Sequence, residues 1–420
     1  MKVIILSATT GGGHMSAANA IKNYLSDFAY EVLVLDTIEY INPILNKTIT
    51  EGYEYLAKKR PNIYKVMYET ANREKIMKAI TKVNSLISKK LAPLIDEYNP
   101  DVIITTHPFS TEMVSRLKGS GKINIPIVCI MTDYAPHRTW INSSVDAYVV
   151  ANDDMIQSMY DMGVPYWKVY PYGIPISEGF YAKKDKAIVL KEMGLNPGIP
   201  TILIMAGSFG VKNILEIYKE IIEIPLSFQI IVITGRNEQL YDSIEKVING
   251  EKSKESSFEI FRKFICAVTS KILKTHDSVR NEKNRKISGS IKEIKDVHKA
   301  NTRVIYFTKE VNKYMQTADL IITKPGGLTV TEALACNLPM AIFDAIPGQE
   351  DENANFLINK NMAIRLEKGE RGAKSIKELL ECASKLESMK SSCKTFDKSD
   401  SLKKIKLLLE RICQTSNTVC

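Results

Sequence analysis

The stretch from Ile321 to Phe356, IITKPGGLTVTEALACNLPMAIFDAIPGQEDENANF, decides the fold of this chain. The apolar run from Asp319 to Thr323 predicts a short buried strand, the glycines at residues 326–327 predict a sharp turn, and Thr329 to Cys336 predicts a helix. A helix start leaves backbone N–H groups unpaired, and adjacent glycines let an anion approach them closely. We therefore expect a strand, turn and helix that bind an anion.

Glu332, which we place in the first turn of this helix, has two interpretations. The motif Thr329-x-x-Glu332 fits a capping box, in which the carboxylate closes the helix on itself. The carboxylate could instead accept hydrogen bonds from a ribose. The motif alone favours the capping box, but PGQE at residues 347–350 and Asn353 follow the next buried run. Carboxylates and amides at the carboxyl end of a strand suit sugar hydroxyls, and this favours a ligand site.

Length and composition indicate a globular chain of two domains. The chain has 420 residues, of which 45% are apolar and 25% charged. Its seven cysteines are scattered without metal-ligand spacing, and no apolar stretch reaches the roughly eighteen residues of a membrane span. We therefore expect reduced thiols in a cytoplasmic protein. The net charge of +9 favours an anionic surface, and by itself leaves nucleic acid and membrane open.

The first domain follows a doubly wound pattern. A strand at residues 3–6, the turn TTGGGH at 9–14 and a helix from Met15 to Leu25 form its first unit. After Asp101 the alternation resumes, and the segments TTHP and MTD place His107 and Asp133 at strand ends, where open α/β sheets bind ligands. The composition of Pro171 to Pro175 is that of a linker between domains.

Two segments differ from this pattern. Residues 41–95 are helical in character and rich in Lys, Tyr and Met, which fits either ordinary amphipathic helices with a solvated basic face or helices on an anionic lipid surface. Residues 237–301 are polar and contain no convincing strand, so we interpret them as an insertion of helices and flexible chain in the second domain. His276 and His298, both in this insertion, are expected at the surface.

The segment KPGGLTVTEALACNLPMAIFDAIPGQEDENA, residues 324–354, resembles the donor-nucleotide signature of the monogalactosyldiacylglycerol synthase and processive diacylglycerol glucosyltransferase family. This family is related to the glycosyltransferase that makes lipid II. The GGGH turn and TDYAPHRTW at residues 132–140 are similar to family segments as well, so the resemblance runs from Gly11 to Asn355 without the insertion. It implies the GT-B fold, an α/β architecture of two Rossmann-like domains that face each other across a cleft.

The resemblance also implies the division of the chain. Residues 1–172 would form an acceptor and membrane-facing domain, and residues 173–400 a UDP-sugar-binding domain with the insertion at about 237–301. Residues 401–420 would form a last helix that packs on the first domain.

The site residues carry over from the family motifs. Contacts to UDP are expected from Gly207, Ser208, Phe307, Gly327, Leu328, Thr329 and Glu332, and contacts to the hexose from Gln349, Glu350 and Asn353. For Ser208 and Phe307, a turn residue and a buried aromatic are alternatives. The acceptor-side residues are Gly12, Gly13, His107, Thr132, His137 and Trp140. His107 fits a structural or acceptor-lining role better than a catalytic one.

His14 and Asp133 compete for the role of general base. The family's GGGH histidine is important for activity, and an imidazole titrates near the working pH, although a histidine at a helix start is often only a cap. Burying a carboxylate such as that of Asp133 at the end of a strand costs free energy, unless the group is paired with a charge or a hydrogen-bond donor or takes part in the chemistry. The residues alone leave this choice open.

The resemblance implies an inverting transfer of glucose or galactose from a UDP-sugar to diacylglycerol at the inner membrane face. The sequence lacks an Asp-x-Asp motif, so we expect neither a cofactor nor an essential metal. The expected anionic partner is a membrane rather than nucleic acid. Three alternatives remain: transfer of N-acetylglucosamine to a polyprenyl-linked acceptor, a UDP-sugar epimerase, and a non-catalytic regulator that responds to UDP-sugar or lipid.

Overall fold

The structure is a computed structural model of the chain, and it describes residues 1–9, 12–41, 66, 88–205, 212–250, 292–343 and 345–417. Three predicted features therefore lie wholly or largely outside the described residues: Gly207 and Ser208, most of the basic segment 41–95, and residues 251–291 of the insertion, with His276.

The described chain forms two compact units. Unit 1 comprises Met1–Lys183, Lys324–Arg365 and Met389–Cys420, and unit 2 comprises Lys184–Thr323 and Leu366–Ser388. The predicted boundary at residue 172 stays a prediction: the strands within residues 324–365 join the second sheet described below, although these residues are grouped with unit 1. Residues 324–365 belong to unit 1 because their first helix packs closely on the first glycine turn and on the strand-end loop at Thr132, as described below.

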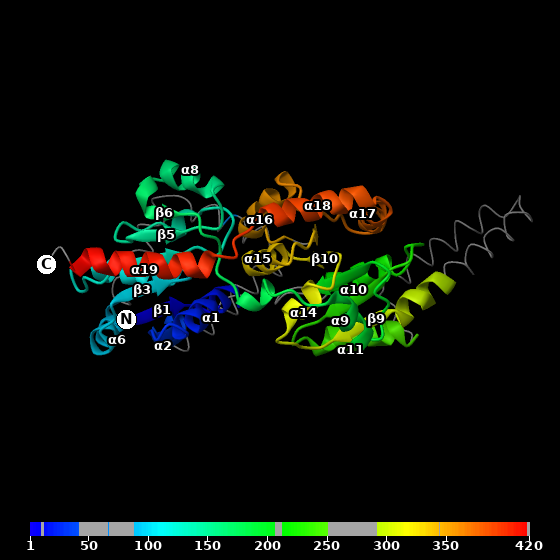
Figure 1. Cartoon of the computed structure of the whole chain (residues 1–420), viewed down its shortest axis with the longest axis horizontal. Coiled ribbons are helices and arrows are strands. Elements are labelled where there is room, and N and C mark those ends of the chain that lie inside the picture. Colours follow the sequence, from blue (N-terminus) through cyan, green and yellow to red (C-terminus); the bar gives the residue numbers. More distant parts are fainter. Residues whose placement is uncertain are drawn as a thin grey trace, which may run out of the picture. The chain divides into compact units, whose positions relative to one another are not determined.

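Unit 1 contains a parallel six-stranded sheet in the order β2-β1-β3-β4-β5-β6. Figure 1 labels β1, β3, β5 and β6 of this sheet. Its strands are β1 Lys2–Ser7, β2 Glu31–Asp36, β3 Val102–Thr105, β4 Ile127–Ile130, β5 Ala147–Val149 and β6 Val169–Tyr170. The register pairs Val3 with Val32 on one side and with Val102 on the other. β3 and β4 are buried along their whole length, as expected for parallel strands whose two faces are both covered.

The helices that surround this sheet begin at turns or at capping residues. Those that follow the strands of the first sheet are α1 Gly13–Ser26, α2 Thr37–Ile41, α6 Ala92–Tyr98, α7 Pro108–Gly119 and α8 Asp154–Asp161. α1 begins two residues before the predicted Met15, because Gly12 caps it in the left-handed conformation, with φ of 77°. Only glycine adopts this left-handed conformation without a cost in conformational energy.

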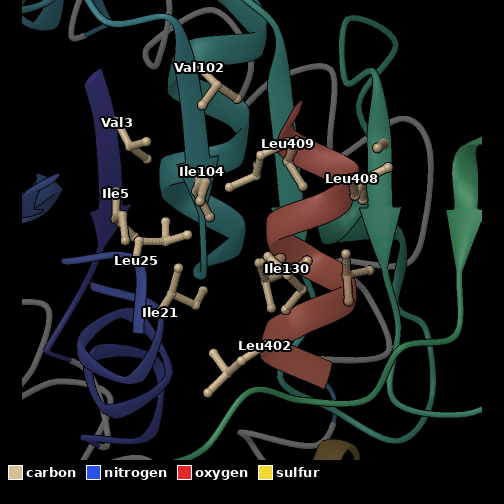
Figure 2. Packing of buried hydrophobic residues seen from close by; sticks show 14 of the residues in the cluster. Val3, Ile5, Ile21, Leu25, Val102, Ile104, Ile130, Leu402, Leu408 and Leu409 are labelled. Atoms are coloured by element: carbon tan, nitrogen blue, oxygen red, sulfur yellow. The ribbon is translucent and has the colours of Figure 1, made fainter. Parts of the chain in front are cut away.

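The last helix, α19 Ser401–Asn417, packs on the sheet of unit 1. Figure 2 shows its side chains Leu402, Leu408 and Leu409 among residues of α1, β3 and β4. Leu408 and Leu409 are almost completely buried there. The expectation that the last helix covers the first domain therefore agrees with the structure, and the apolar surface buried supplies the physical reason.

The second sheet, also of six parallel strands, has the order β12-β11-β10-β7-β8-β9. Its strands are β7 Thr201–Met205, β8 Gln229–Ile233, β9 Thr302–Ile305, β10 Leu320–Thr323, β11 Met340–Ile342 and β12 Ala363–Arg365. The helices of this part of the chain are α9 Lys186–Glu192, α10 Lys212–Ile221, α11 Glu238–Ile248, α14 Val311–Met315, α15 Gly327–Ala335, α16 Gln349–Asn359, α17 Glu370–Glu381 and α18 Ala383–Thr395.

Two expectations about the insertion are wrong. Residues 238–248 form α11, a crossover helix between β8 and β9 that buries Leu240 and Ile244, so this part belongs to the repeating fold. His298 is buried rather than at the surface. Its ring stacks on Phe228, and both ring nitrogens lie within hydrogen-bonding distance of backbone carbonyl oxygens.

Candidate active site

His14 is held at the start of α1 with one defined tautomer. Its Nδ1 lies 2.8 Å from the carbonyl oxygen of Thr106 and 2.8 Å from Oγ1 of Thr132. A carbonyl oxygen can only accept, so these partners assign the proton of the neutral ring to Nδ1. The lone pair of His14 then lies on Nε2, the nitrogen that could accept a proton from a substrate.

His107 caps α7 beside this ring. Its Nδ1 accepts the backbone N–H of Phe109 at 3.2 Å, and its ring centroid lies 4.6 Å from that of His14 in an edge-to-face arrangement. Burial lowers the pKa of His14 to about 4. Burial, followed by the proximity of His14, also holds the pKa of His107 well below its ordinary value. Both rings are therefore neutral at physiological pH, and His107 has a capping role.

Asp133 lies just beyond β4, buried, with a donor on each oxygen. Its Oδ2 accepts the indole N–H of Trp140 at 3.2 Å, and its Oδ1 accepts the side-chain amide of Gln349. Burial raises the pKa of Asp133 to about 6, and the hydrogen bonds from Gln349 and Trp140 oppose that shift. The carboxylate is thus predominantly ionised at neutral pH and fixed in position by its two donors.

Two of the acceptor-side residues predicted after β4, Thr132 and Trp140, lie beside His14. Trp140 is buried, and its ring centroid lies 6.1 Å from that of His14. His137 is the N-cap of the short helix η2 Arg138–Trp140, where its Nδ1 accepts the N–H of Thr139 at 3.3 Å. His137 therefore holds the turn that places Trp140, whereas Thr132 contacts the catalytic candidate directly.

The glycine turn before α15 packs on this same cluster. A Cβ atom at Gly327 would overlap the carbonyl oxygen of Thr132, whereas a Cβ atom at Gly326 would meet nothing within 4 Å. A Cβ at Gly13 would lie 3.3 Å from Leu328. The two glycine turns therefore approach each other as only small residues allow, and Leu328 is buried in their contact. α15 has no side-chain cap, which leaves the N–H groups of its first turn available to an anion.

Glu332 does not form the capping box. α15 begins at Gly327, so Glu332 is its sixth residue and lies in the second turn rather than the first. Within the described chain its carboxylate has no hydrogen-bond or ion-pair partner, and burial alone raises its pKa to about 8. A largely buried carboxylate without a partner is costly, and a ligand hydroxyl would relieve that cost.

The three hexose candidates have different surroundings. Gln349 begins α16 after Gly348, whose φ is 99°, and donates to Asp133. Glu350 accepts the N–H of Ile346 at 2.6 Å, and burial raises its pKa. Gln349 therefore contacts Asp133 directly, and Glu350 contacts the loop that precedes α16.

Asn353 is fully buried, and both ends of its amide are engaged. Its oxygen accepts the N–H of Tyr134 at 2.8 Å, and its nitrogen donates to the carbonyl of Pro325 at 3.0 Å. It therefore joins the loop that carries Asp133 to the turn that carries Gly327. The structure gives it a bridging position rather than one open to a sugar.

Phe307 lies in unit 2, on a cavity of about 730 Å³ at the carboxyl ends of β8 and β9. Its ring is 45% exposed, so the buried-aromatic alternative is excluded, and the guanidinium of Arg236 lies 4.9 Å from the ring centroid. Arg236 was missed in the sequence analysis. Its position directly after β8 and Gly235 was the available signal.

The comparisons with known proteins agree with this arrangement. The family model of monogalactosyldiacylglycerol synthase matches residues 14–176, and that of the C-terminal domain of glycosyltransferase family 28 matches residues 267–408. A protein of Staphylococcus carnosus called processive diacylglycerol beta-glucosyltransferase is 30% identical over 382 residues, which cover 90% of this chain and 84% of that protein. A protein of the same name from Bacillus pumilus is 28% identical and covers 100% of this chain and 96% of its own length.

Solved structures support the fold. The crystal structure of MurG from Acinetobacter baumannii superposes with a TM-score of 0.56 at 13% identity, covering 98% of this chain and 99% of that one. The complex of MnaA from S. aureus with UDP gives a TM-score of 0.55 at 12% identity, covering 96% and 94%. The expected GT-B fold is thus confirmed. The chain belongs to the family of the monogalactosyldiacylglycerol synthases and processive diacylglycerol glucosyltransferases.

Proposed function

We propose that this glycosyltransferase moves glucose from UDP-glucose to diacylglycerol with inversion at the anomeric carbon, giving a β-glucosyldiacylglycerol, and that it can add further glucose units. The observation that carries this proposal is the neutral His14 ring, whose Nδ1 is held by Thr106 and Thr132 and whose Nε2 is therefore unprotonated, on a helix start that packs against the start of α15. Glucose is preferred over galactose because the relatives that span nearly the whole chain are named glucosyltransferases.

The acceptor side of the reaction requires a base. The hydroxyl of diacylglycerol must lose its proton as its oxygen attacks the anomeric carbon, and His14 Nε2 is the proposed acceptor of that proton. The carbonyl of Thr106 keeps Nδ1 protonated, so the ring cannot turn its N–H toward the substrate without losing this bond. A bound diphosphate would favour the imidazolium and raise the low pKa of His14 during the reaction. Asp133 is the alternative base.

The donor side requires stabilisation of the leaving UDP. We assign the diphosphate to the backbone N–H groups of Gly327, Leu328 and Thr329 at the start of α15, where the helix dipole is positive. Glu332 would accept the ribose hydroxyls, and the cavity beside Phe307 would take the uracil ring. Gln349 and Glu350 would contact the hexose.

A metal is not required by this scheme, because backbone N–H groups supply the charge stabilisation. We expect transfer to continue at an undiminished rate after dialysis against EDTA. The measurement is the initial rate with and without added Mg²⁺ or Mn²⁺. A strict dependence on either ion would reject this part of the proposal.

Glu332→Gln should remove a pH dependence of stability. The pKa of Glu332 is raised from 4.5 to about 8 in the folded state, so between these values the folded protein binds more protons than the unfolded chain. Stability therefore falls as pH rises through this window, by at most about 1.4 kcal/mol per pH unit from this group. Urea unfolding of wild type and variant at several pH values between 5 and 8 measures the difference.

The same position tests the ribose contact. Glu332→Ala should weaken UDP binding about tenfold, because the variant loses the carboxyl group that would hydrogen-bond the ribose hydroxyls in a buried site. Isothermal titration with UDP measures it, with Glu378→Ala on the exposed face of α17 as a control that loses the same type of side chain away from the site. An unchanged affinity for UDP would remove Glu332 from the donor site.

The membrane is the proposed place of action, with the protein held peripherally on the inner face of the cell membrane. The described part of the chain has no helix with the length and apolar character of a membrane span. The lipid acceptor supports a peripheral location, as does the basic composition of residues 41–95. Cosedimentation with anionic liposomes tests it, and failure to cosediment at low salt would contradict it.

The function is tested with purified protein, diacylglycerol liposomes and radiolabelled UDP-glucose, UDP-galactose or UDP-N-acetylglucosamine in parallel. Labelled glycolipid from UDP-glucose supports the proposal, and the donor with the highest kcat/KM identifies the sugar. A polyprenyl-linked acceptor in place of diacylglycerol tests the nearest rival. Absence of glycolipid with all three donors would reject the proposal, and conversion of the donor to its epimer would indicate the epimerase reaction.

A further inference from the structure

A second cavity of about 460 Å³ lies in unit 1, away from the candidate active site. It is bounded by the short helix η1 Lys89–Leu91, the end of α7, and the loops that precede β4 and β5. The strands are parallel, so residues that precede them lie at the amino edge of the sheet, whereas Asp133 follows β4 at the carboxyl edge. We call this hollow the amino-edge cavity.

The charged side chains that line the amino-edge cavity, among the described residues, are all basic. Lys89, Arg116 and Lys122 line it, and no carboxylate is among the described residues that line it. The ammonium groups of Lys89 and Lys122 have no hydrogen-bond or ion-pair partner within the described chain. Arg116 is fixed by Glu112, which accepts from its Nε at 3.0 Å and from its Nη2 at 2.6 Å. Two cations are therefore free to meet an anion, and a third is held in place beside them.

Serine hydroxyl groups supply much of the remaining lining, together with Leu117, Gly119 and Asn142. Ser88, Ser115, Ser120, Ser143 and Ser144 all border the cavity. Ser115 Oγ accepts the backbone N–H of Ser144 at 3.3 Å, so its own hydroxyl proton is free to be donated. The hydroxyl of Ser120 already donates to the carbonyl of Leu117 at 3.0 Å, so it does not count among the free donors. Serine hydroxyls and Lys or Arg side chains are donors that bind phosphate oxygens.

The carbonyl groups at the end of α7 are hydrogen-bonded, which reduces their repulsion of an anion here. The N–H groups of Ser120, Gly121 and Lys122 already satisfy the carbonyls of Arg116, Lys118 and Leu117, each at 3.0 Å. The negative end of this helix is thereby capped by its own backbone. Lys118, which also lies at this end, is paired with Asp146 at 2.5 Å and does not line the cavity.

We propose that the amino-edge cavity binds a phosphomonoester group, either as free phosphate or as the headgroup of an anionic lipid. Its volume is that of a small-ligand site, and its cations match a dianion. The site is separate from the donor site, so it stands independently of the proposed glycosyl transfer.

The test titrates inorganic phosphate into the full chain in the presence of saturating UDP, so that the start of α15 is occupied. The double variant Lys89→Ala, Lys122→Ala should bind phosphate about tenfold more weakly than wild type, because it loses both unpaired cations. The control is Lys374→Ala, Lys377→Ala on α17, which loses the same charge from exposed i,i+4 pairs and should bind phosphate as wild type does. Circular dichroism confirms that both variants are folded.

Vesicles separate the two sources of phosphate. Phosphatidylcholine vesicles with phosphatidic acid should retain wild type more strongly than the first double variant if the ligand is a lipid headgroup. Loss of phosphate binding alone, with vesicle retention unchanged, identifies free phosphate as the ligand. Absence of phosphate binding by wild type, or equal weakening in both double variants, would overturn the proposal.

Discussion

Replacing His14 with alanine is expected to reduce kcat for glycolipid formation by about 10²- to 10⁴-fold, with the affinity for UDP preserved. The reason is that Nε2 carries the lone pair of the neutral ring, since the carbonyl of Thr106 requires a proton on Nδ1. Removal of the ring deletes the base and leaves the start of α15 unchanged. Turnover by steady-state assay and UDP affinity by calorimetry are the two measurements.

The neighbouring histidine provides a matched control. His107 caps α7 through Nδ1, and asparagine is also a good N-cap residue. His107→Asn should therefore retain turnover within a small factor, although its ring lies only 4.6 Å from that of His14. Near-normal turnover of His14→Ala would move the base to Asp133, and equal losses in the two variants would assign both rings to packing.

The pH profile distinguishes the two candidate bases. A base must be unprotonated, so kcat/KM falls as pH decreases through the pKa of the base in the free protein. With His14 as base the half-loss lies near its pKa of about 4, whereas with Asp133 it lies near about 6. A rate that stays constant between pH 8 and 5 supports His14. A half-loss near pH 6 that disappears in Asp133→Asn contradicts it.

Gly327→Ala should be the most destabilising single methyl addition at the site, costing about 1–3 kcal/mol of folding free energy. The added Cβ would overlap the backbone carbonyl oxygen of Thr132, and a backbone atom cannot rotate away as a side chain can. The turn or the loop must shift, and either movement disturbs the contact of Thr132 with His14. Urea unfolding measures the loss of stability, and the transfer assay measures the loss of turnover.

The adjacent glycine is the control. Gly326 has φ of −68° and ψ of 136°, which any residue adopts, and a Cβ there meets nothing within 4 Å. Gly326→Ala should therefore change stability by about 0.5 kcal/mol or less. Equal destabilisation by the two substitutions would show that the close approach at Gly327 is not what limits this turn.

Much of the fold could be predicted because parallel strands are continuous apolar runs. The strand at residues 3–6 and the strand before the PGG turn both form as expected. The starts of α1 and α15 were placed two residues late, because glycine has a poor helix propensity and the turn geometry overrides it. α11 was assigned to an insertion rather than to the repeating fold, because its polar composition conceals an amphipathic pattern in which only Leu240 and Ile244 are fully buried.

The site was predictable in its residue types and less so in its contacts. His14, Thr132 and Asp133 lie together, as strand ends and a glycine turn in one sheet require. The bridging position of Asn353 depends on Tyr134 and Pro325, and these partners are far from it in sequence. The buried position of His298 similarly depends on carbonyls of a distant loop. Such contacts depend on tertiary packing, so a local sequence pattern cannot predict them.

The most direct test of the central claim is the identity of the lipid formed from diacylglycerol liposomes and UDP-glucose. The account predicts a glucosyldiacylglycerol of β configuration, identified by mass and by the proton spectrum of its anomeric centre, which forms with wild type and is nearly absent with His14→Ala. An α-linked product, or equal product formation by the two proteins, would contradict the account.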